Sequence, residues 1–281
     1  MTHRYSRSTL VREIALALLA CVFVLPIYLL VVASLKSQDQ IDASPLSLPR
    51  PPTAANYSQA WTQGAGFGGT SIPSALATSV LITTFSVAVL VILGSLAGYV
   101  LGRRTSRMSA ALYLLFVLGL IIPFQMTIVP LYRLLNLLGL VGSRSGMVLI
   151  YSGLLMPLSV FLYTGFVRAI PPDYEEAALV DGAPRLWIFA RVVFPLLRPV
   201  TGTVAILGGV FIWNDFFTPL VFLGGTTHQT LPVAIYSFVG RYLSQWGLIF
   251  AGVVIAITPV LLVYFAFQRY VIRGFATGLK G

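Results

Sequence analysis

The sequence predicts an all-helical membrane protein that crosses the bilayer six times. Of its 281 residues, 57% are hydrophobic and only 9% are charged, and the mean hydropathy is +0.90. A water-soluble chain of this length would need far more charge on its surface. The apolar residues gather into six runs of about 20 residues, the length that a helix needs to cross the hydrocarbon core.

These runs define one polytopic domain over residues 1–281. The first run could instead be a signal peptide, because three arginines precede it. Its apolar part is longer than the roughly 7 to 15 residues of a signal core, so we favour a retained span. The predicted spans are 14–35, 74–101, 109–132, 147–167, 200–223 and 246–267.

The distribution of basic residues predicts the orientation of the chain. Six spans place both termini on one side of the membrane, and that side carries 13 of the 18 Lys and Arg residues. Because connections rich in Lys and Arg remain in the cytoplasm, both termini are expected there, as is the connection 168–199. The net charge of +10 then reflects orientation and contact with anionic lipid, and nucleic-acid binding is not expected.

Several kinds of chemistry lack the residues they need. Cys21 is the only cysteine, and His3 and His228 are the only histidines, which argues against a metal site or a histidine-based catalytic triad. The two lysines, Lys36 and Lys280, do not follow a glycine, so the chain has no phosphate-binding loop. We therefore expect neither an enzyme nor a cofactor or metal on this chain.

One connection is unusually acidic. Four of the eight acidic residues fall within positions 173–181. Asp173 is expected to be the N-cap of a short helix that begins at Tyr174, with Glu176 at the capping-box position. Gly182 can end that helix in the left-handed conformation, and Pro184 suits the first turn of a second helix. On this basis alone, the acids could simply stabilise the positive end of the helix dipole.

The same connection resembles the cytoplasmic loop of ABC importer permeases. The family pattern is E-A-A, three residues, G, nine residues and I-x-L-P, and the matching residues are Glu176, Ala177, Ala178, Gly182, Val192, Phe194 and Pro195. Val192 and Phe194 replace Ile and Leu but keep the apolar character. The resemblance implies a coupling helix that docks on a separate ATPase through Tyr174, Glu175, Glu176, Ala177, Ala178, Asp181 and Gly182.

Four further stretches resemble the smaller permease of maltose-type carbohydrate importers: "SLKSQDQI", "AANYSQAW", "WNDFFTPLVFL" and "QRYVIRGFATGLKG". The resemblance implies a subunit of the bacterial inner membrane that moves a sugar or sugar derivative inward by alternating access. Its implied partners are a second, different permease, an external substrate-binding protein and an ATPase dimer that binds ATP and Mg. It further implies that Gly278 and Lys280, in the C-terminal tail, reach the ATPase.

Asp215 is the one acidic residue inside a predicted span. With Trp213 and Asn214 it could hydrogen-bond and stack on a sugar, or it could serve helix packing or gating. The alternative function is a secondary transporter driven by an ion gradient, for which several intramembrane carboxylates would be expected. A membrane-integral enzyme would need a nucleophile or metal constellation that the composition does not offer.

Overall fold

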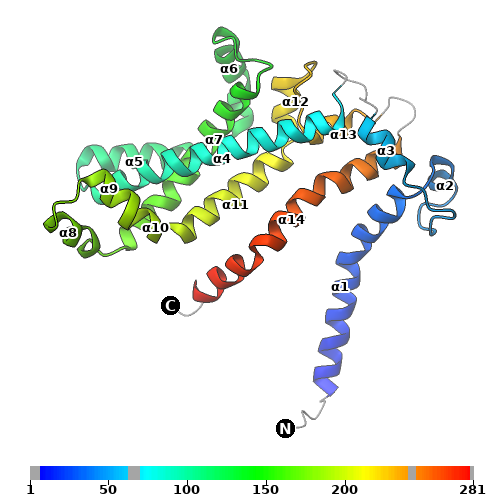
Figure 1. The fold of residues 1–281 in the computed structure, drawn as a ribbon, viewed down its shortest axis with the longest axis horizontal. Helices are drawn as coiled ribbons and strands as arrows, with labels where there is room; N and C mark the ends of the chain where they lie inside the picture. The colour runs from blue at the N-terminus through cyan, green and yellow to red at the C-terminus, as the bar shows by residue number, and fades with distance from the viewer. Residues whose placement is uncertain (1–6, 63–69, 240–244, 279–281) are drawn as a thin grey trace. The chain divides into compact units, whose positions relative to one another are not determined.

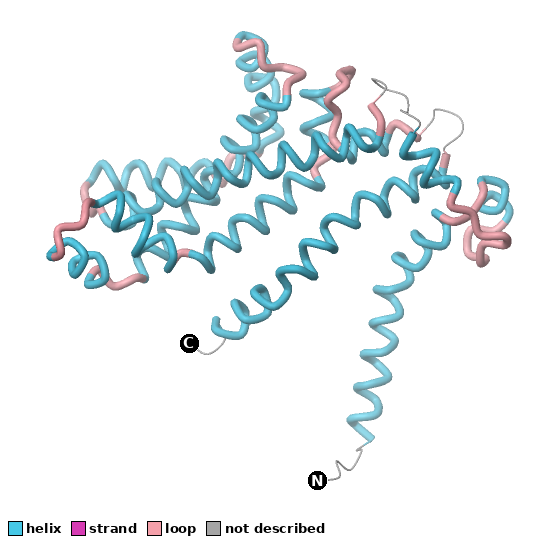
Figure 2. The backbone as a smooth tube through the Cα atoms, viewed as in Figure 1, coloured by secondary structure: helices cyan, strands magenta, loops and turns pink. Residues whose placement is uncertain are grey.

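The computed structural model describes residues 7–62, 70–239 and 245–278, and within these ranges it contains helices and loops but no strand (Figures 1 and 2). Four of the described helices are each long and apolar enough to cross a membrane. They are α1 (Arg7–Ser34), α4 (Ile72–Arg103), α7 (Arg144–Ala169) and α14 (Trp246–Gly278). The predicted all-helical membrane fold is thereby confirmed.

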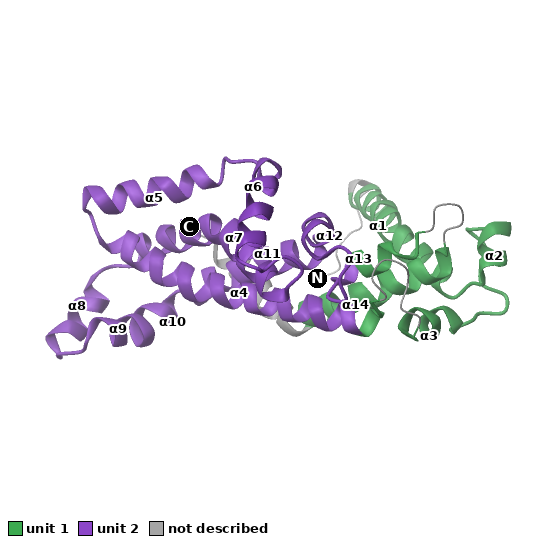
Figure 3. Ribbon diagram, turned by 90° about the horizontal axis from the view of Figure 1, so that it is seen from above, with its two compact units in different colours: residues 1–73, 233–269 green, residues 74–232, 270–281 purple. Residues whose placement is uncertain are grey.

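The chain divides into two compact units (Figure 3). Residues 1–73 and 233–269 form the first, which contains α1, α2 (Gln38–Ala43), α3 (Ala55–Thr62) and most of α14. Residues 74–232 and 270–281 form the second. Its further helices are α5 (Arg107–Gly119), α6 (Phe124–Leu137), α8 (Asp173–Val180), α9 (Arg185–Ile188), the π-helix η1 (Phe189–Val193), α10 (Phe194–Leu196), α11 (Arg198–Asn214) and α12 (Phe217–Leu223). Helix α13 (Leu231–Tyr236) bridges the boundary.

Two of the predicted spans are not continuous helices. The third divides into α5 and α6, which are bent by 103° across residues 120–123. Pro123 is the N-cap of α6, and a proline disfavours helical backbone at the residue before it, so α5 cannot run on into α6. The fifth divides at Asp215, between α11 and α12. A second strongly bent pair is formed by Arg185–Leu196 and Arg198–Asn214. With this pair and the α5–α6 pair each counted as one span, the described helices provide up to six.

Helices α4 and α7 pack closely through glycines. Gly94, Gly98 and Gly102 recur every fourth residue of α4, and a Cβ built on any of them would overlap α7. For Gly98 the obstructing atoms include backbone, with the nitrogen of Thr164 only 3.0 Å away. Small residues at this spacing let two membrane helices approach backbone to backbone. This contact between α4 and α7 was not predicted from the sequence, although glycines at every fourth position are the signal that could have indicated it.

In the first unit, the motif residues after α1 complete the end of that helix. The last carbonyl groups of a helix have no partner within it. Here the Asn56 amide donates to the carbonyls of Ser34 (2.8 Å) and Lys36 (2.7 Å), and the backbone N–H of Thr53 donates to that of Leu35 (2.8 Å). The "SLKS" and "NYSQAW" stretches are therefore the two halves of one polar cap.

Lys36 is fully buried in this cap. Its ammonium donates to the carbonyl oxygens of Ser44 (2.8 Å) and Pro45 (3.0 Å) and to the hydroxyl of Ser47 (3.2 Å). An ammonium has three N–H donors, and all three are used. Lys36, which precedes α2, therefore holds the end of α1 to residues 44–47 through three internal hydrogen bonds.

Candidate functional site

The acidic connection folds into α8, a tight turn and α9, near the end of α4 that carries Arg103 (Figure 1). Helix α8 begins at Asp173, one residue earlier than predicted, and its N-cap is Pro172, which makes no side-chain cap. The predicted Asp173 cap and capping box are therefore wrong. Pro172 already has helical dihedral angles, and its carbonyl accepts the N–H groups of Glu175 (2.8 Å) and Glu176 (3.1 Å).

Gly182 ends α8 as predicted. Its φ of +79° lies in the left-handed region. The N–H groups of Gly182 and of the following residue, Ala183, both donate to carbonyl groups in the last turn of the helix. That of Gly182 donates to the carbonyl of Leu179 (3.0 Å), and that of Ala183 donates to the carbonyl of Ala178 (3.0 Å). These two bonds make a Schellman motif, which glycine favours because it carries no Cβ.

Glu175 faces the protein body. One carboxylate oxygen, Oε1, forms an ion pair with Arg103 Nε at 2.6 Å, and the other, Oε2, accepts a hydrogen bond from the Tyr99 hydroxyl at 2.7 Å. The side chains of Arg103 and Glu175 are only 20% and 12% exposed. Both partners lie in the last two turns of α4, more than 70 residues earlier in the sequence, which is why no local pattern indicated them.

The same two α4 residues contact other parts of the connection. Arg103 Nη1 donates to the carbonyl of Ile170 (2.9 Å), the residue that caps α7. The Tyr99 ring lies 5.2 Å, centroid to centroid, from that of Phe189 in η1. Phe189 belongs to a buried cluster that also includes residues of α4, α7 and α11. The connection is therefore fastened to the ends of α4 and α7 by both polar and apolar contacts.

The opposite side of the connection is exposed and largely apolar. Val180, Leu186, Tyr174 and Trp187 are 88%, 70%, 57% and 50% exposed. The residues implied as ATPase contacts thus occupy two sides. Glu175 is buried and Ala178 half-buried, whereas the exposed members are Tyr174, Glu176, Ala177, Asp181 and Gly182.

Beyond α9 the chain enters α11 through a π-helical turn. Val193 in η1 is fully buried, while Val192, Phe194 and Pro195 of the resemblance motif are half-buried. The segments Arg185–Leu196 and Arg198–Asn214 meet at 75°. Two apolar positions of the motif, Val192 and Phe194, therefore pack against the buried cluster close to the bend that joins the connection to α11.

Asp215 lies at the break between α11 and α12. Its Oδ2 accepts a hydrogen bond from the buried Tyr151 hydroxyl (3.0 Å), and its Oδ1 accepts from the backbone N–H groups of Phe217 (3.0 Å) and Thr218 (3.3 Å). The carboxylate thus caps the first turn of α12 and ties it to α7. Neighbouring Trp213 is half-buried, and Asn214 is exposed with its amide bonded to the carbonyl of Val210 (2.8 Å).

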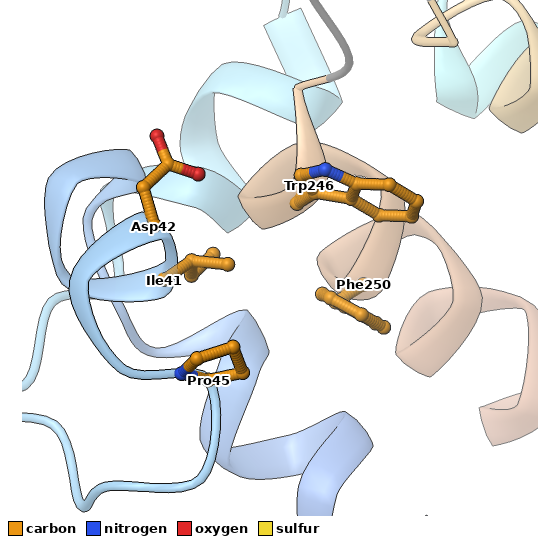
Figure 4. A pocket seen from close by; sticks show the side chains of 5 residues that line it. All are labelled: Ile41, Asp42, Pro45, Trp246 and Phe250. Carbon is orange, nitrogen blue, oxygen red and sulfur yellow. The ribbon is translucent and has the colours of Figure 1, made fainter.

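The first unit contains an open pocket with a cavity volume of about 430 Å³ (Figure 4). Its lining comes from α2 and the residues after it on one side and from the start of α14 on the other: Ile41, Asp42, Pro45, Trp246 and Phe250. In the tail, Gly278 is the last residue of α14, and Lys280 lies outside the described residues. No group of three or more His, Cys, Asp or Glu in the described ranges could hold a metal ion.

The helical fold, with four to six apolar segments of sufficient length to cross a bilayer among the described residues, defines a multi-pass membrane protein. Residues 91–277 match the family model described as "Binding-protein-dependent transport system inner membrane component", and the chain belongs to that family. The resemblance to ABC importer permeases is confirmed, and the chain is a transport subunit rather than an enzyme.

Curated relatives match nearly the whole chain. The melibiose/raffinose/stachyose import permease protein MelC of Bacillus subtilis is 37% identical over 99% of this chain and 100% of its own length. The probable starch degradation products transport system permease protein AmyC of Thermoanaerobacterium thermosulfurigenes is 34% identical over 92% of each chain. A chain of a bacterial ABC transporter that imports the polysaccharide alginate has a TM-score of 0.80 and 22% identity, covering 96% of this chain and 99% of its own, so the fold is shared.

Proposed function

We propose that this chain is one of two different permease subunits of an ABC importer for a sugar or sugar derivative. The external substrate is delivered by a binding protein, and ATP with Mg is hydrolysed on partner ATPase subunits rather than on this chain. Transport proceeds by alternating access, with both termini and the connection 168–199 in the cytoplasm. The names of the relatives support the substrate class, because they include import permeases for melibiose, raffinose and starch degradation products.

The observation that carries the proposal is the two-sided connection in a chain that matches this family almost end to end. Its inner side is held by Glu175 and by apolar packing, while its outer side presents Tyr174, Val180, Leu186 and Trp187 to solvent. Exposed apolar clusters with charged neighbours are typical of protein interfaces. We assign the exposed residues Tyr174, Glu176, Ala177, Asp181 and Gly182 to the ATPase dock.

The geometry of Asp215 supports this function over the secondary transporter. An ion-coupling carboxylate must exchange its ion or proton during the cycle. Asp215 instead accepts three hydrogen bonds from Tyr151, Phe217 and Thr218, which suit a residue that shapes the helix break. In our proposal the residues Trp213 to Asp215 line or organise the substrate route, and Asp215 acts chiefly through the position of α12.

The test is to purify the tagged chain from its native membranes and to reconstitute what accompanies it. We expect an ATPase and a second permease to co-purify, and uptake of labelled melibiose or raffinose to require ATP, Mg and the binding protein. Replacing the exposed acid, Glu176→Lys, is expected to remove the ATPase but not the second permease. A lone wild-type chain that transports when given only an ion gradient would overturn the proposal.

A further inference from the structure

We infer that Glu175 and Arg103 form an internal latch that makes the coupling connection and the end of α4 move as one body. The inference rests on the proposed function, since it concerns how motion of an ATPase would reach the spans. It assigns Glu175 a positioning role inside the permease, which is distinct from the docking role that the family resemblance implied for it.

The contacts of Glu175 leave little of its carboxylate for a partner protein. Oε1 is held by Arg103 and Oε2 by Tyr99, and the side chain is 12% exposed. The adjacent Glu176, about 100° further around the same helix, is exposed. Two neighbouring acids therefore have separate tasks, with Glu176 facing outward and Glu175 facing the spans.

Arg103 connects three elements through one guanidinium group. Nε binds Glu175 of α8, Nη1 binds the carbonyl of Ile170 at the end of α7, and the side chain itself belongs to α4. A planar guanidinium with donors in fixed directions sets the geometry of such a junction more strictly than an ammonium would. The junction fixes α8 at its first turn, immediately after the chain leaves α7.

This arrangement changes which spans receive the motion of the connection. By sequence, the connection joins only α7 and α11, so a push on α8 would act directly on those two helices. The latch adds α4, which does not adjoin the connection in the sequence, and the close glycine packing of α4 on α7 reinforces it. A partly buried ion pair suits this task, because losing one partner leaves the other charge poorly solvated.

A double-mutant cycle in the reconstituted importer tests the latch. The variants are Arg103→Gln, Glu175→Gln and both together, with uptake per ATP hydrolysed as the readout and ATPase co-purification measured alongside. We expect each single change to lower that ratio about tenfold while the ATPase still co-purifies. The double variant should be no worse than the poorer single, because the second change removes an interaction that is already lost.

The matched control is Asp173→Asn, which removes one acidic charge from the exposed side of the same first turn. Asp173→Asn alone should lower uptake per ATP hydrolysed only slightly. When it is combined with Arg103→Gln, the two fold-losses should multiply, because the two residues act independently. Two outcomes would overturn the latch. One is a loss of uptake per ATP hydrolysed of about a hundredfold in the Arg103→Gln, Glu175→Gln double variant, which would mean that the two changes act independently. The other is a normal ratio of uptake to ATP hydrolysis in both single variants.

Glu175→Asp covers the case in which the neutral variants fail to accumulate. It keeps the charge but shortens the side chain by one methylene group, so the pair with Arg103 loosens. We expect weaker coupling with unchanged ATPase co-purification. Loss of co-purification instead would place Glu175 in the dock and overturn the inference. If no ATPase accompanies the wild-type chain, it is the proposed function that has failed, so the two failures are distinguishable.

Discussion

The two units each contain a polar fastening at a helix end, and they use charge differently. In the second unit, Arg103 and Glu175 neutralise one another across more than 70 residues of sequence and remain 20% and 12% exposed. In the first unit, Lys36 is fully buried and binds three neutral oxygens, all within 11 residues of it. The short-range fastening shapes one connection, whereas the long-range one joins separate helices, so only the latter can carry motion between them.

The largest effect is expected at the Lys36 fastening. Lys36→Met keeps the volume of the side chain but leaves the carbonyls of Ser44 and Pro45 and the Ser47 hydroxyl without their donor. The cost should be about 3 kcal/mol of unfolding free energy. Thermal unfolding of the purified chain in detergent measures it. The control is Arg50→Met, which removes an exposed cation from the same connection and should change stability by less than about 0.5 kcal/mol. Equal losses would mean that Lys36 matters only as a surface charge.

A smaller, more local effect is expected at the turn after α8. Gly182→Val forces a β-branched residue to φ +79°, at a cost of about 1 to 2 kcal/mol, although a Cβ there would meet no neighbour. The end of α8 should therefore be distorted without unfolding of the spans. We expect a normal amount of permease in the membrane but loss of ATPase co-purification. Gly182→Asn should be milder, because asparagine tolerates this conformation; equal behaviour of the two variants would exclude backbone strain as the cause.

The smallest effect is expected for the hydrogen bond from Tyr99 to Glu175, which accompanies the ion pair between Arg103 and Glu175. Tyr99→Phe removes the hydroxyl that donates to Glu175 but keeps the ring on Phe189 and the ion pair with Arg103. The unfolding free energy should fall by about 1 kcal/mol. Uptake per ATP hydrolysed should fall less than in Arg103→Gln. A greater loss than in that variant would show that the hydroxyl, and not the ion pair, is the principal tie.

Local chemistry predicted one part of the site well and another part poorly. The glycine turn at Gly182 follows from backbone geometry alone, so its sequence signal was sufficient. The direction in which each acid faces was not predictable, because Asp173, Glu175 and Glu176 all lie in one turn and only the position of Arg103 distinguishes them. The burial of Lys36 was missed for a similar reason: its acceptors are mostly backbone carbonyls, which every sequence has.

The same limit applied to the spans. Hydropathy located the apolar runs, but it does not register whether backbone hydrogen bonding continues through them. Pro123 and Asp215 interrupt the third and fifth runs because one removes an N–H and the other captures the N–H groups of the following turn. Both residues can be read directly from the sequence. Individual proline and aspartate positions therefore predict helix breaks better than hydropathy averaged over a stretch of residues.

Because α4 is long, a small tilt at its Arg103 end produces a much larger displacement at its other end. A helix of 32 residues is about 48 Å long at 1.5 Å per residue. If α4 pivots at the Arg103 end, a tilt of about 5° would sweep the opposite end through about 4 Å, more than the width of a water molecule. Such a lever would turn a slight rotation at one membrane face into a gate-sized displacement at the other.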